Sequence, residues 1–128
     1  MNTRVQLNRA LLIGVVVWLS ACASAPPNLS PAGVTAFNNT RVVKGLDLVR
    51  DTAITANAQT PPLVSTDTTR KIVTYHRSAL LVIRDVPTGW KASVLTGLDE
   101  TVKNLPGNEA QLFAPYVALV KTLIQEIR

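Results

Sequence analysis

Residues 65–89 read STDTTRKIVTYHRSALLVIRDVPTG, and this stretch decides between an all-α and a mixed fold. Its middle, residues 72–83, is rich in β-branched side chains, which are enriched in strands. The stretch is nevertheless too long for an ordinary strand, and its apolar residues recur at the three- and four-residue steps of a helix face. Ser65 or Asp67 can cap its start, and the Pro-Thr-Gly turn breaks it. We therefore predict a helix that runs to about Asp85.

Two other segments show the same helical periodicity. One covers about residues 30–57 and begins with Ser30-Pro31, an N-cap hydroxyl followed by proline at the first helical position. The other covers about residues 90–105 and ends at Pro106-Gly107, because these two residues do not continue a helix. Both segments are long enough for several helical turns.

A last helical segment follows to the end of the chain. Asn108 with Gln111 resembles a capping box at its start. Pro115 falls inside the pattern, where it removes one backbone hydrogen bond and either bends the helix or restarts it. Because the apolar period continues through Pro115, we predict one kinked helix. The predicted fold class is all-α, a small bundle of about four helices.

The apolar stripes also predict the core of this bundle. Replacing Leu80 or Leu119 with alanine is expected to cost about 2–5 kcal/mol. The predicted core residues are Leu46, Val49, Ile72, Leu80, Ile83, Leu98, Val102, Leu119 and Leu123.

The N-terminus has the three parts of a secretory signal. Arg4 and Arg9 give it a positive start without any acidic residue, and the uncharged run ALLIGVVVWL follows at residues 10–19. An apolar run of this length suits a signal peptide, whereas a membrane-spanning helix needs about 20 apolar residues. Residues 19–22 then read Leu-Ser-Ala-Cys. The alternatives are an uncleaved anchor and ordinary cleavage just before Pro26.

This arrangement resembles the signal of bacterial lipoproteins, whose lipobox is an aliphatic residue, two small residues and a cysteine. In this chain those residues are Leu19, Ser20, Ala21 and Cys22. The resemblance implies that Cys22 is acylated, for example with palmitate, and becomes the first mature residue. Ala23 is not aspartate, which resembles the class sorted to the outer membrane.

We accordingly predict three regions. They are a signal peptide at 1–21, a lipidated cysteine with a proline-containing tether at 22–29, and a helical domain at 30–128. The expected location is the outer membrane, with the domain lipid-anchored and facing the periplasm. We expect acylated Cys22 to provide the contact with the membrane.

The chain offers few residues for catalysis. Cys22 is the only cysteine, and His76 is the only histidine, so we expect no metal and no cofactor. His76 borders an apolar helix face, where an ordinary hydrogen bond is the expected role. Asp99 and Glu100 are adjacent and therefore point about 100° apart on a helix, which does not make an acid/base pair. We expect no enzymatic activity.

Charge and aromatic residues bear on possible partners. The 13 basic and eight acidic side chains include Arg4 and Arg9 of the signal, and the other basic residues are scattered. No basic cluster suggests a nucleic-acid groove, so we expect no nucleic acid partner. Trp90 follows the helix-breaking Pro-Thr-Gly turn and is a possible partner contact, although a plug at the end of the bundle is the simpler alternative.

The leading expectation is therefore a non-enzymatic structural or interaction module with an envelope protein partner. In size, export and helix content the chain is similar to pilotins, the small lipoproteins that guide outer-membrane secretins. The alternatives are a phage or mobile-element lipoprotein of the spanin or exclusion type, and a carrier that encloses an apolar ligand.

Overall fold

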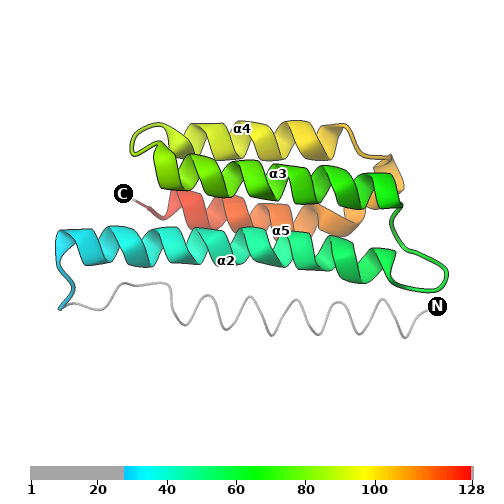
Figure 1. Cartoon of the computed structure of the whole chain (residues 1–128), viewed down its shortest axis with the longest axis horizontal. Coiled ribbons are helices and arrows are strands. Elements are labelled where there is room, and N and C mark those ends of the chain that lie inside the picture. The colour runs from blue at the N-terminus through cyan, green and yellow to red at the C-terminus, as the bar shows by residue number, and fades with distance from the viewer. Residues whose placement is uncertain (1–27, 128) are drawn as a thin grey trace. The chain divides into compact units, whose positions relative to one another are not determined.

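The computed structural model describes residues 28–127. This part of the chain is all-α, as predicted, and contains four helices without a strand. The four helices are drawn in Figure 1 and comprise α2 (Pro31–Asn57), α3 (Thr66–Asp85), α4 (Trp90–Lys103) and α5 (Gly107–Gln125). The predicted signal peptide, lipobox and most of the tether lie outside the described residues.

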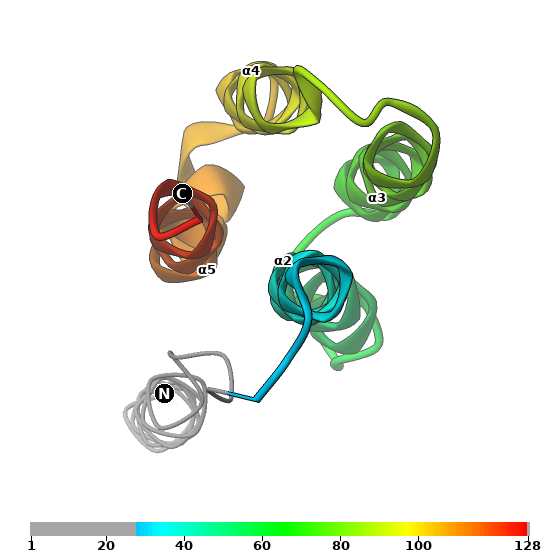
Figure 2. The ribbon, with the colours of Figure 1, turned by 90° about the vertical axis from the view of Figure 1, so that its left-hand side faces the viewer.

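The chain divides into two compact units, Met1–Arg41 and Val42–Arg128, with the boundary inside α2. The packing described below is that of the second unit. In this unit α3, α4 and α5 follow one another around a common core, and the end-on view places α3 and α5 on opposite sides of it (Figure 2). The result is a small helical bundle.

Local sequence signals set most of the helix boundaries. The Ser65 hydroxyl accepts a hydrogen bond of 3.1 Å from the backbone N–H of Thr68, so Ser65 caps α3 as one of the two predicted alternatives. Helix α5 runs unbroken through Pro115, which confirms a single element. The predicted capping box at its start is wrong, because Pro106 occupies the N-cap position and no side chain caps the helix there. A cap by Asn108 fails because the helix has already begun at Gly107.

The buried face of α2 is the one that its periodicity indicates. The predicted core residues Leu46 and Val49 are buried, together with Val42, Ala53 and Ala56, which share their stripe. Among the other predicted core positions, Ile72, Leu98 and Leu123 are also buried. Charged side chains flank this stripe on both sides. The periodicity of the apolar residues therefore allows only one face for the core.

Four predicted core residues, Leu80, Ile83, Val102 and Leu119, are only half-buried, and the last three pack against the buried cluster from its edge. In α5 the predicted Leu123 is buried together with Phe113, Val117 and Val120, whereas the predicted Leu119 is not fully buried. The physical reason is that α5 is apolar on several sides. Two overlapping stripes about 100° apart then fit the same period, and only packing against neighbouring helices selects one of them.

The contact between α3 and α4 contains a buried tyrosine. The Tyr75 hydroxyl donates a hydrogen bond of 2.8 Å to the backbone carbonyl of Val94. A Cβ atom at Gly97 would lie 3.1 Å from ring atom Cε2 of Tyr75, so glycine is what lets the ring lie against α4. Burial, together with the nearby charge of Asp99, raises the pKa of Tyr75 well above its usual value.

This raised pKa predicts a loss of stability in alkali. The unfolded phenol ionises near pH 10, whereas the folded phenol stays protonated, so the folded state binds more protons above that pH. The stabilisation is complete below about pH 10 and falls, by up to about 1.4 kcal/mol per pH unit, as the pH rises toward the folded pKa. Urea unfolding of wild type and Tyr75→Phe across this range measures the effect. The prediction would be contradicted if wild type and Tyr75→Phe lost the same free energy of unfolding as the pH rises.

Candidate functional site

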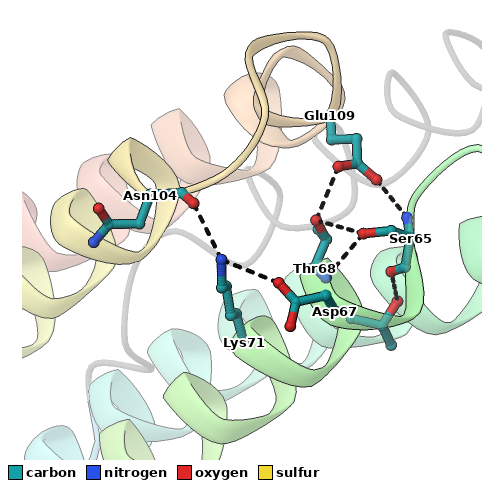
Figure 3. Close-up of polar contacts among 7 residues, drawn as sticks. Ser65, Asp67, Thr68, Lys71, Asn104 and Glu109 are labelled. Carbon is teal, nitrogen blue, oxygen red and sulfur yellow. Dashed lines mark hydrogen bonds and ion pairs between the residues drawn. The ribbon is translucent and has the colours of Figure 1, made fainter.

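The most buried acidic side chain that the structure describes is Glu109, in the first turn of α5, with 7% of its surface exposed. One carboxylate oxygen accepts a hydrogen bond from the backbone N–H of Ser65, and the other accepts one of 3.0 Å from the Thr68 hydroxyl. Figure 3 shows this carboxylate aimed at the start of α3. A residue of α5 therefore caps the N-terminus of α3.

The hydroxyls around Glu109 form a closed chain of hydrogen bonds. Ser65 donates to the Thr68 hydroxyl at 3.1 Å, and Thr68 in turn donates to Glu109. A negative charge at a helix N-terminus is favourable because it meets the positive end of the helix dipole. A threonine hydroxyl between serine and carboxylate does not act as a base toward the serine, so the chain holds helices together and does not activate a nucleophile.

A lysine connects the same region to the end of α4. Lys71 lies 3.2 Å from Asp67 as an ion pair, and its ammonium group donates a hydrogen bond of 3.3 Å to the backbone carbonyl of Asn104. A cation at the C-terminal end of a helix is favourable for the same electrostatic reason. The start of α3, the end of α4 and the start of α5 thus meet at one end of the second unit, as Figures 1 and 3 show. We call Ser65, Thr68, Lys71 and Glu109 the junction cluster.

The single histidine lies elsewhere, between α2 and α3. Nε2 of His76 is 2.6 Å from the nearer carboxylate oxygen of Asp47, and the ring is buried. Asp47 is partly exposed and also lies 3.7 Å from Arg50. The ordinary hydrogen bond expected for His76 is therefore present, and its function is to join two helices.

The remaining candidates from the sequence are dispersed. Trp90 is buried at the start of α4 with 6% of its surface exposed, which favours the core alternative over a contact with a partner. Asp99 forms an ion pair of 2.6 Å with Lys121 on the surface. Cys22 and the lipobox residues Leu19, Ser20 and Ala21 lie outside the described residues.

Two further features are absent from the described part of the chain. Among residues 28–127 no group of three or more His, Cys, Asp and Glu side chains could hold a metal ion. None of the helices there combines the length and apolarity needed to cross a bilayer.

Comparisons with known proteins add no relative. No protein-family model matches the chain, and neither a curated protein nor a solved structure matches it. The site therefore rests on its own geometry.

Glu109 was not among the residues that the sequence singled out. An acidic residue in the first turn of a helix is common, because it favours the helix on which it sits. The sequence held two separate local signals, this acid and the serine cap at the start of α3. Nothing in the sequence shows that positions 65 and 109 lie together. They come together because α4 runs back along the bundle, so that α3 and α5 both begin at the same end.

Proposed function

We propose that this chain is a lipid-anchored envelope lipoprotein whose helical bundle is a non-enzymatic interaction module for another envelope protein. The observation that carries the proposal is the lipobox at residues 19–22, preceded by a positive start and a short apolar run. A single acyl chain binds membranes only reversibly, whereas several chains give lasting attachment. Ala23, which is not aspartate, supports the outer membrane as the proposed location of acylated Cys22, with the domain in the periplasm.

The use of the buried polar residues supports a non-enzymatic role. The Glu109 carboxylate, the His76 ring and the Tyr75 hydroxyl each make a hydrogen bond that joins one helix to another. Catalytic acids and bases need instead to reach a substrate within hydrogen-bond distance. In this chain these groups stabilise the bundle, and the surface of the bundle is left to bind a partner.

The first test is intact mass and acyl labelling of the membrane fraction, with wild type beside Cys22→Ser. We expect the wild type to begin at acylated Cys22 and to stay in the membrane fraction. Cys22→Ser is expected to lose the acyl label and to keep residues 1–21, because the signal peptidase for lipoproteins acts on the lipidated cysteine. A wild-type product that carries residues 1–21 and no lipid would overturn the anchor.

A matched variant and a crosslink complete the test. Ser20→Ala keeps a small residue in the lipobox, so it should be processed like wild type. In the same cells, a photo-crosslinking residue at Ile54, which is 48% exposed, should capture an envelope protein. The same crosslinker at exposed Thr122 of α5 serves as the comparison. Identical adducts at both positions, or none at either, would contradict a specific partner surface.

A further inference from the structure

The outer face of α3 carries three arginines at seven-residue intervals. Arg70, Arg77 and Arg84 are all exposed. Seven residues fall only about 20° short of two full helical turns, so the three side chains lie along one line and about 10 Å apart. The core side of α3, formed by Ile72, Tyr75 and Ala79, is on the opposite side of the helix. We call Arg70, Thr74, Arg77, Leu81 and Arg84 the arginine face.

The arginine face contains no acidic residue. The two acids nearest to it, Asp67 and Asp85, lie about 60° around the helix, and each already has a basic partner on α3. Arg84 pairs with Asp85, but neither Arg70 nor Arg77 forms an ion pair with any residue between 28 and 127. Ordinary solvated surfaces mix both signs of charge, so this face has a net positive potential.

The same face exposes aliphatic surface among the arginines. Leu81 lies between Arg77 and Arg84 and is 50% exposed, the largest exposed fraction among the big apolar side chains that the structure describes. Leu80 and Val73 at its edge are half-buried. Basic side chains held near a membrane are attracted to anionic headgroups, and an exposed leucine between them adds apolar contact.

We propose that the arginine face docks on anionic phospholipid headgroups of the membrane to which the chain is anchored. This inference rests on the proposed function, since the anchor supplies the proximity. Cys22 and Pro31 are nine residues apart, and such a chain extends at most about 30 Å, so the domain is held next to the bilayer. Tethering makes a contact that is weak by itself occur at a high effective concentration. Guanidinium groups match phosphate oxygens with two parallel hydrogen bonds, and Leu81 reaches the apolar layer below them.

The test uses the mature lipidated protein in vesicles. Cys22 is the only cysteine and its thiol is consumed by acylation, so Thr74→Cys carries the one free thiol for an environment-sensitive fluorophore such as NBD. The labelled protein is reconstituted into vesicles of phosphatidylcholine alone or mixed with phosphatidylglycerol. We expect the emission at position 74 to rise and shift to shorter wavelength only in the mixed vesicles. Added salt should reverse the change, because it screens exposed charges.

Two controls separate this docking from other effects. A label at Thr122→Cys, on exposed α5 surface, should report the same emission in both vesicles. Arg70→Gln/Arg77→Gln should abolish the change at position 74, whereas Lys103→Gln/Lys121→Gln, which removes the same charge elsewhere, should retain it. Circular dichroism checks that each variant is folded.

The outcomes distinguish the inference from the proposed function. A lipidated protein whose label at position 74 gives the same emission in both vesicles overturns the docking and leaves the anchor intact. Equal changes at positions 74 and 122 also overturn it, because they show adsorption without a preferred face. A purified protein whose mass contains no acyl chains overturns the anchor and, with it, the docking.

Discussion

Leu98→Ala is expected to lower the free energy of unfolding by about 2–5 kcal/mol. Leu98 is fully enclosed in α4, with 0% of its surface exposed, and it belongs to the central apolar cluster. Removing its side chain loses the transfer free energy of three carbon atoms and leaves a cavity that rigid helices only partly fill. Urea unfolding followed by circular dichroism measures the loss.

Leu80→Ala is the matched control, because the residue type and the substitution are the same. Leu80 is half-buried on α3, so less apolar surface returns to water and no enclosed cavity forms. We expect a loss of about 1 kcal/mol or less, which replaces the larger loss that the apolar pattern predicted for Leu80. Equal losses at Leu80 and Leu98 would show that the buried face of α3 is not the one described.

Glu109→Ala is the second large effect, an expected loss of about 2–3 kcal/mol. The substitution removes the acceptor for the Ser65 N–H and for the Thr68 hydroxyl, which is itself buried with 1% exposed. Buried donors without an acceptor cost their full desolvation energy. It also removes the negative charge from the N-terminus of α3. Chemical denaturation gives the value.

Glu109→Gln and Thr68→Val test the origin of that loss. The amide of glutamine retains one acceptor oxygen, so Glu109→Gln should cost less than Glu109→Ala. Thr68→Val keeps the shape and removes the hydroxyl. In a double-mutant cycle, the loss from Glu109→Ala should be smaller when Thr68 is already valine. Strict additivity would mean that the two side chains do not stabilise the bundle through their contact.

The positions and lengths of the helices were largely predictable. The observed α3 and α4 begin at Thr66 and Trp90, beside the predicted starts, because helix caps and helix-breaking turns act within a few residues. Ser65 shows this most clearly, since its hydroxyl bonds to an N–H only three residues away. The wrong prediction of a capping box at Asn108 shows the limit of such local reasoning, because several residues within one turn could each begin the helix.

Which side of each helix is buried was predictable only where polar residues left one choice. The stripe through Leu46 and Val49 on α2 met this condition. On α5 both sides are apolar, so the period did not choose between Phe113 and Leu112, and the neighbouring helices did. Half-buried Leu80 is the corresponding case on α3, where buried His76 and Thr68 take positions that an apolar pattern does not reveal.

The junction cluster was beyond sequence reasoning for a related reason. Glu109 contacts residues more than 40 positions earlier in the chain, and no pattern of residue types records such a contact. The same holds for Asp47 and His76, which come from different helices. Each side chain has an ordinary local interpretation, and the distant one follows only from how the helices pack.

By itself, the sequence determined that the described chain is all-α, where its helices begin and end, and which face of α2 is buried, because these depend on hydrogen bonds and periodicity within a few turns. The lipobox prediction likewise depends only on neighbouring residues. The tertiary structure alone decided the buried face of α5, the burial of Trp90 and the pairing of Glu109 with the start of α3. These depend on contacts between residues distant in the chain, where many pairings satisfy the same local pattern and packing selects one.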